Sequence, residues 1–219
     1  FEPALFAVSD RVNNRYKVCM AIGSGDREHP LWWQYPYTGA TNRFYVRLDD
    51  LNVSDSTEAQ DLDEMTNYSG TTSCTSLGAM PNGTMKGWYM NLAAGEQVVT
   101  SALIASCMVT FSTNRPLAGS STSCSAALGV ASGYWVNLFN ASGGIGVDGT
   151  CGGQRSSTFI GGGLPPSPVM ASGVPVEGRA VSVVIGAVQK SGGASVAIRP
   201  QKIRPSINSR RRKAYSYTK

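Results

Sequence analysis

The side chains that could take part in chemistry are few, and they do not converge on one reaction. The only histidine, His29, lies in a charged turn, and a single imidazole leaves no Ser/His/Asp arrangement to assemble. Residues 23–25 read Gly-Ser-Gly after an apolar run, as in a dinucleotide loop, but Glu28 takes the place of the third glycine. No helical pattern follows to bind a pyrophosphate. The sequence therefore predicts a tight turn here and a protein that is not an enzyme.

An acid-rich segment at residues 49–64, with seven acids, is the candidate metal site. Position 6 of a notional calcium loop would be Asp55, where such loops need glycine, and position 12 would be Asp61 in place of a bidentate glutamate. A calcium loop and a solvated acidic loop both remain open, and we assign no metal ligand and no cofactor. The oxygen-bearing side chains at positions 1, 3, 5, 7, 9 and 12 are Asp50, Asn52, Ser54, Ser56, Glu58 and Asp61.

The five cysteines are not spaced as zinc ligands, because no two form a C-x-x-C pair and only one histidine accompanies them. They indicate one or two disulfides in an oxidising compartment with one thiol left over, or alternatively five buried thiols in a cytosolic protein. Spacing does not determine the connectivity. We rank the Cys124–Cys151 pair first, because these residues flank an expected hairpin that begins at residue 133.

Two regions are candidate partner-binding surfaces. Trp32 and Trp33 lie among tyrosines and prolines in residues 30–37, a cluster that is either an exposed adhesive surface or a buried plug between strands. Residues 199–219 hold eight bases and no acid, and a run of three arginines forms their centre. No helix-turn-helix, zinc finger or aromatic RNA platform accompanies this tail, so we predict partner docking and no nucleic-acid binding. The three arginines are Arg210, Arg211 and Arg212.

The elements that position these residues are expected to be short β-strands. Residues 43–48 alternate apolar and polar side chains, the period of a half-buried strand. Regular turn signals between the strands favour a sandwich, barrel or propeller, and residues 61–66 are the one expected helical turn. No apolar run is long enough to span a membrane, and we expect a chain that opens on Phe1 to be a processed or excerpted piece. Further strands are expected at residues 16–22, 87–92, 97–100, 102–104, 108–113, 133–138, 168–171, 180–188 and 195–199.

Several short motifs follow one another in a fixed order from Ile22 to Tyr217. They are I-G-S-G-D-R-E-H-P-L at residues 22–31, T-N-R-F-Y-V at 41–46, K-G-W-Y-M-N-L at 86–92 followed by G-E at 95–96, an apolar strand at 102–113, G-G-G-L-P-P-S-P-V at 161–169 and R-R-R-K-A-Y-S-Y at 210–217. In this order they resemble the PilC/PilY family of type IV pilus proteins.

The resemblance implies an all-β chain that forms the C-terminal blades of a β-propeller, with antiparallel four-stranded sheets completed by chain outside this sequence. Residues 1–205 would be the propeller portion and residues 206–219 a basic terminal strand or tail. The family is found at the pilus tip, outside the cell, reached through the periplasm. Its members support pilus assembly, antagonise retraction and mediate surface adhesion and twitching motility.

The same resemblance implies partners and a possible ion. Minor pilins and the remaining N-terminal part of the same precursor would be protein partners, and a host or abiotic surface would be the adhesive target. The family's propellers often bind calcium, but its acidic loop has no clean copy here, so calcium is expected only in the wider propeller.

Two other function classes compete with this interpretation. A quinoprotein-type propeller enzyme would need repeated tryptophan docking motifs and a vicinal cysteine pair, and the sequence has neither. A self-assembling extracellular β-sandwich filament subunit would need a donor strand, which residues 194–204 could provide. Such a subunit would be repeated along the filament, whereas a tip protein would be present in one copy per tip.

Overall fold

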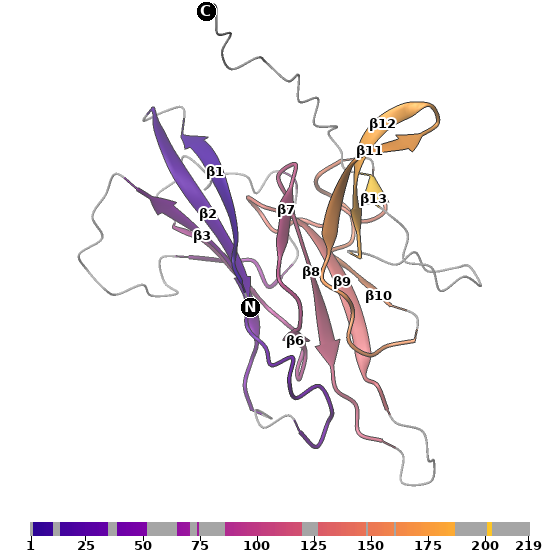
Figure 1. The fold of residues 1–219 in the computed structure, drawn as a ribbon. Coiled ribbons are helices and arrows are strands. Elements are labelled where there is room, and N and C mark those ends of the chain that lie inside the picture. The colour runs from indigo at the N-terminus through magenta and orange to yellow at the C-terminus, as the bar shows by residue number, and fades with distance from the viewer. Residues whose placement is uncertain are drawn as a thin grey trace, which may run out of the picture.

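The computed structural model describes residues 2–10, 14–34, 39–51, 65–70, 74, 86–119, 127–147, 149–159, 161–186 and 201–202. Within these ranges the chain forms β-strands and turns and contains no helix. The all-β prediction is therefore confirmed for the described residues. The strands form three sheets, which we number in chain order: sheet 1 from strands within residues 4–91, sheet 2 from strands within residues 97–158 and sheet 3 from strands within residues 169–202. In Figure 1, sheet 2 lies between sheets 1 and 3.

Sheet 1 has the strand order β1-β2-β3-β5-β4. Its neighbouring strands are antiparallel except β4, which runs parallel to β5. The predicted alternation at residues 43–48 is confirmed, because Phe44, Val46 and Leu48 are buried on one face of β3. The strand bounds are β1 Ala4–Asp10, β2 Arg15–Gly23, β3 Arg43–Asp50, β4 Thr66–Asn67 and β5 Gly87–Asn91.

Sheet 2 has the order β10-β9-β8-β6, and β7 also pairs with β8. Ser106 and Cys107 join β7 to β8 with φ angles of 49° and 62°, the left-handed backbone that a tight hairpin turn requires. All of these pairings are antiparallel. The strand bounds are β6 Gln97–Val98, β7 Leu103–Ala105, β8 Met108–Arg115, β9 Val130–Asn137 and β10 Ser156–Thr158.

Sheet 3 is a hairpin with a short third strand, in the order β11-β12-β13. Its strands are β11 Val169–Val176, β12 Arg179–Ile185 and β13 Gln201–Lys202. The described strands thus form sheets of five, five and three strands, and none of the three closes into a barrel. Four-stranded propeller blades are therefore not confirmed. Of the expected helical turn, residues 61–64 lie outside the described residues, and Thr66 belongs to β4.

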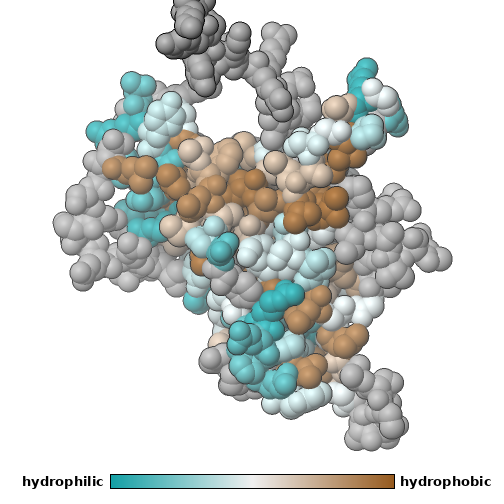
Figure 2. All heavy atoms as spheres, in the orientation of Figure 1, coloured by the Kyte–Doolittle hydropathy of each residue, from teal (hydrophilic) through white to brown (hydrophobic). Residues whose placement is uncertain are grey.

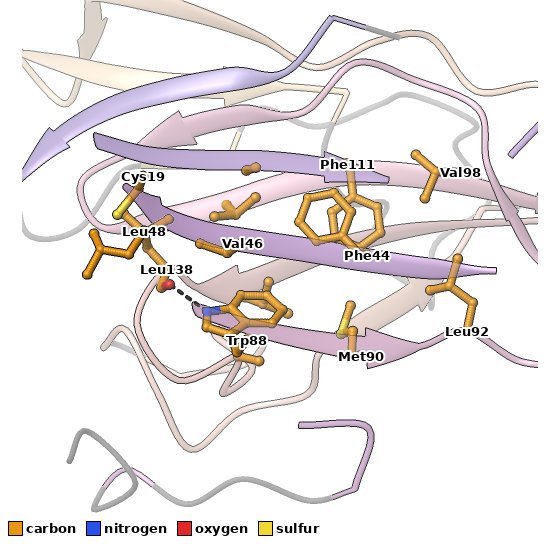
Figure 3. Close-up of a cluster of buried hydrophobic side chains, with 14 residues drawn as sticks. Cys19, Phe44, Val46, Leu48, Trp88, Met90, Leu92, Val98, Phe111 and Leu138 are labelled. Carbon is orange, nitrogen blue, oxygen red and sulfur yellow. Dashed lines mark hydrogen bonds between the residues drawn. The ribbon is translucent and has the colours of Figure 1, made fainter. Parts of the chain in front are cut away.

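The main core lies where sheet 1 faces sheet 2 (Figure 3). Phe44 of β3 stacks on Phe111 of β8 with ring centroids 3.7 Å apart, and Phe111 stacks in turn on Tyr134 of β9 at 4.7 Å. The indole N–H of Trp88 donates to the carbonyl oxygen of Leu138 at 2.7 Å, so this buried polar group is satisfied. Each buried aromatic side chain contributes about 2–3 kcal/mol of transfer free energy to folding.

Two glycines lie where sheet 1 packs tightly on sheet 2. A Cβ at Gly23 would lie 2.3 Å from a methyl carbon of Val98, and a Cβ at Gly25 would lie 2.1 Å from the carbonyl oxygen of Val98. The N–H of Val98 donates to the carbonyl oxygen of Ser24 at 3.0 Å. The Gly-Ser-Gly segment therefore leaves β2 with its backbone bonded to Arg43 on one side and to Val98 of β6 on the other. No turn forms at residues 23–26, so the predicted tight turn is not found there.

Candidate binding surface

The segment at residues 24–34, which we call the tryptophan loop, is anchored at its base to both sheets. Toward sheet 1, the N–H of Ser24 donates to the carbonyl oxygen of Arg43 at 2.8 Å. Toward sheet 2, the N–H of Asp26 donates to Oε1 of Gln97 at 2.8 Å. Arg27 donates from Nη1 to the carbonyl oxygens of Val99 and Pro165. These bonds hold the start of the loop in one conformation.

A local pair stiffens the middle of the loop. Nδ1 of His29 lies 2.6 Å from Oδ2 of Asp26, and the N–H of Glu28 donates to the other carboxylate oxygen at 3.0 Å. The hydrogen bond with His29 is the main reason that the pKa of Asp26 lies below its usual value. The sequence placed His29 in a charged turn, and its contact with Asp26 agrees with that interpretation.

The tip of the loop presents both tryptophans to solvent. The N–H of Gln34 donates to the carbonyl oxygen of Leu31 at 2.9 Å, which closes a turn with Trp32 and Trp33 at its two central positions. Trp32 is 51% exposed and Trp33 is 67% exposed. The buried-plug interpretation is wrong for these two residues. Neighbouring Tyr35 and Tyr37 lie outside the described residues.

Two adjacent exposed indoles on an anchored loop are suited to binding. Tryptophan offers a large flat apolar surface with one N–H donor, and it is enriched among residues that dominate protein–protein affinity. A loop whose base is held by hydrogen bonds loses little conformational entropy when a partner binds to its tip. The arrangement therefore suits recognition.

A buried carboxylate behind the loop was not singled out by the sequence as a site. Glu96 is 8% exposed, and its Oε1 accepts hydrogen bonds from the hydroxyls of Thr113 and Tyr134, the latter at 2.9 Å. Its Oε2 accepts from the N–H of Ala93 at 3.1 Å. Nδ2 of Asn42 donates to the Glu96 carbonyl oxygen at 3.0 Å, which connects this network to the strand beside the tryptophan loop. The signal that could have identified it is the Gly-Glu pair at residues 95–96.

The disulfide in the structure joins Cys74 to Cys151, with the two Cα atoms 5.4 Å apart. The expectation of a disulfide is confirmed, but the predicted Cys124–Cys151 pairing is wrong, because Cys151 already has Cys74 as its partner. Residues 143–145 pair with residues 153–154, and this turn carries Cys151 toward Cys74, which is distant in sequence. Cys124 lies outside the described residues.

The remaining predicted site residues are not tested by the structure. Arg210, Arg211 and Arg212 lie outside the described residues, as do residues 52–64 of the candidate calcium loop. Across the described ranges, no group of three or more His, Cys, Asp or Glu side chains is placed to hold a metal ion. A search of the same ranges finds no helix with the length and apolar character that crossing a membrane requires.

No family model matches the chain, and no curated protein matches it. Among solved structures, the chain is similar to the crystal structure of the Pseudomonas aeruginosa PilY1 C-terminal domain, with a TM-score of 0.48 and 11% sequence identity. The likeness covers 84% of this chain and 42% of that chain, so the protein spans less than half the length of that structure.

Proposed function

We propose that this chain is part of an extracellular protein at the tip of type IV pili. In this role it supports pilus assembly, antagonises retraction and mediates surface adhesion and twitching motility. The proposal assigns the chain no catalytic activity.

The observation that carries the proposal is that the family-like motifs meet at one junction. Gly25 from the first motif packs on the Val98 backbone, Phe44 from the second stacks on Phe111, and Trp88 from the third donates to Leu138. Glu96 from the next motif accepts hydrogen bonds beside them. These motifs thus supply contacts between sheets 1 and 2 and also follow one another in the order found in the family. The two observations together support a shared architecture.

The surface of the chain suits packing against further protein. Figure 2 shows hydrophobic residues gathered in a band across the face on which β1, β7 and β11 lie. Large apolar side chains are exposed on the outer strands, with Leu5 on β1 at 61% and Val169 on β11 at 56%. Among the described strands, β1 pairs with β2 alone, so its other edge is open to another strand. The partners we propose are the remaining part of the same precursor and minor pilins.

The tryptophan loop is the adhesive or docking element in this proposal. It exposes Trp32 and Trp33 from an anchored base, whereas the apolar residues of the core are buried between the sheets. We propose that the two indoles contact a minor pilin or the surface to which the pilus attaches. The basic run at Arg210, Arg211 and Arg212 is proposed as a second docking segment, on its charge alone.

The alternative, a self-assembling filament subunit, is not favoured. It would need a donor strand, which residues 194–204 could provide for a neighbouring subunit. Within that segment, Gln201–Lys202 form β13 and pair with β12 in the same chain. These two residues are therefore already paired within their own sheet.

The proposal is tested by deleting this region from the precursor and measuring surface pili in cells with and without active retraction. Loss of pili that returns when retraction is disabled would support a role in antagonising retraction, and loss in both backgrounds would support a role in assembly. Unchanged piliation and twitching in both backgrounds would contradict the proposal. Double replacement of Trp32 and Trp33 by alanine should reduce adhesion while pili persist, with exposed Leu164→Ala as the matched control.

A further inference from the structure

Two thiols from different sheets converge on one end of the core. The first, Cys19, is completely buried in β2, where it is in register with Phe6 of β1 and Leu48 of β3. Figure 3 shows its side chain at the end of the buried cluster where Leu48 and Leu138 also lie. The Cys19 sulfur therefore sits between sheet 1 and the chain segment that follows β9.

The second thiol reaches the same end of the core from sheet 2. Cys107 is the second residue of the turn between β7 and β8, and its carbonyl oxygen accepts the N–H of Leu138 at 2.8 Å. Leu138 belongs to the same buried cluster as Cys19. Strand β7, at whose end Cys107 lies, also contacts β1, the neighbour of β2. Leu138 thus bonds to Cys107 through its backbone and shares with Cys19 the cluster at whose end Figure 3 shows both side chains.

The electrostatics of the two groups agree with this placement. Burial raises the pKa of the Cys19 thiol to about 12, and a negative charge on Cys107 contributes to the rise. Burial also raises the pKa of Cys107, which is partly exposed. In the structure both thiols are free.

We propose that Cys19 and Cys107 form a second disulfide, which joins β2 of sheet 1 to the β7–β8 turn of sheet 2. The oxidant is another disulfide, either that of glutathione or that of a protein oxidoreductase. The Cys107 thiolate attacks one sulfur of this oxidant and releases the other as a thiolate. The Cys19 thiolate then attacks the Cys107 sulfur and displaces the second oxidant thiolate. The two cysteines lose two protons and two electrons, and the oxidant is reduced to its thiols.

The bond would cross-link the two sheets that share the main core. The Cys74–Cys151 bridge ties other segments of the chain, so the two bonds would constrain different loops. Because the Cys19 thiol is fully buried in the folded chain, closure is expected mainly while the chain folds. A cross-link between sheets would also resist separation under the pulling force that a pilus tip bears. That benefit rests on the proposed function, whereas the bond itself does not.

The direct test is peptide mapping of the protein made in an oxidising compartment. The protein is unfolded in iodoacetamide without reductant, digested and analysed by mass spectrometry. We expect a linked peptide pair containing Cys19 and Cys107 that disappears after reduction, and an alkylated Cys124. Recovery of Cys19 and Cys107 as alkylated thiols, or of either one linked to Cys124, would overturn the proposal. This outcome does not depend on any pilus role.

Substitutions give a second, independent readout. Cys19→Ala and Cys107→Ala should each lower the melting temperature by roughly 10 °C in oxidised protein, as expected for opening a long loop. The double variant should be no less stable than the less stable single variant, because only one bond is lost. Cys124→Ala is the control and should leave the melting temperature unchanged. If the two single losses of melting temperature add up in the double variant, and if the variants remain less stable than the reduced wild type, the cysteines act through packing alone. That result would contradict the bond.

Discussion

At the scale of single residues, the junction between sheets 1 and 2 depends on positions without a side chain. Gly25 is the clearest case, because an added Cβ would meet the Val98 carbonyl oxygen at 2.1 Å and the Val98 nitrogen at 2.7 Å. Both contacts are with backbone, which cannot rotate away. Gly39, by contrast, has no atom within 4 Å of an added Cβ. The two glycines therefore form a matched pair for one substitution.

We predict that Gly25→Ala lowers the free energy of unfolding by roughly 2–4 kcal/mol, because the segment that follows β2 must move away from β6 to make room for the added methyl group. Gly39→Ala should change it by less than about 0.5 kcal/mol. Urea unfolding of both variants checks this. Equal effects of the two substitutions would show that close backbone packing at Val98 is not needed for stability.

The Asp26–His29 pair gives a prediction that depends on pH. The pKa of Asp26 is lowered in the folded protein, mainly by its hydrogen bond with His29, so the stabilisation is present above the unfolded-state pKa and is lost as the pH falls through the lower folded-state pKa. His29→Ala should raise the pKa of Asp26 toward its ordinary value. An NMR titration of the Asp26 carboxyl carbon measures this directly.

Glu28→Ala is the control for that titration, since Glu28 contacts Asp26 through its backbone N–H, which the substitution keeps. It should move the pKa of Asp26 much less than His29→Ala. If both variants leave the titration unchanged, His29 does not hold the carboxylate and the middle of the tryptophan loop is not stiffened in this way.

At the scale of elements, Glu96 lies directly before β6, and its buried hydrogen bonds connect this position to β8 and β9. The Tyr134 hydroxyl of β9 donates to Glu96 at 2.9 Å, beside the Thr113 hydroxyl of β8. Burial first, and the Glu96 charge second, raise the pKa of Tyr134. The folded state therefore favours the neutral phenol. The stabilisation that arises from the raised pKa of Tyr134 is complete below the unfolded-state pKa of about 10. It is lost as the pH rises above that value.

Tyr134→Phe should lower the free energy of unfolding by about 1 kcal/mol near neutral pH, because Glu96 loses one donor. The wild type should lose more stability than this variant between about pH 8 and about pH 11, because only the wild type has the Tyr134 phenol to titrate. Urea unfolding at both pH values checks this. Exposed Tyr16→Phe is the control and should leave stability unchanged. Parallel pH curves for wild type and Tyr134→Phe would contradict the account.

The sequence predicted elements well where the signal is local. The alternation at residues 43–48 corresponds to β3, and the apolar runs at 108–113 and 133–138 correspond to β8 and β9. Strand β1 was missed, because its segment at residues 4–10 reads as mostly apolar without a clear period of two. Such a run does not distinguish a strand from other buried structure.

The parts of the site that were missed depend on tertiary structure. Exposure of Trp32 and Trp33 is decided by the turn that Gln34 closes, and residue types alone left a surface and a plug equally open. The partner of Cys151 is set by which loops the sheets bring together, so Cys74 could not be chosen from spacing. Glu96 appeared only as part of a motif, since the donors to its buried carboxylate come from β8, from β9 and from the loop at Ala93.

At the scale of the whole molecule, the described strands form two sheets around one core and a third sheet beside them (Figure 1). An open edge at β1, exposed apolar side chains on β1 and β11, and an exposed tryptophan loop all point to contacts with other protein. These features are the ones expected of a component of a larger assembly, and the proposed function places that assembly at the tip of a pilus.

The most direct test of that claim is quantitative mass spectrometry of filaments sheared from the cell surface. We predict that this chain is recovered with pilins at far below their amount, together with a larger part of the same precursor, as expected for a component of the pilus tip. Recovery as the major repeating component of the filament, or only from the cytoplasm with all of its thiols free, would contradict the account.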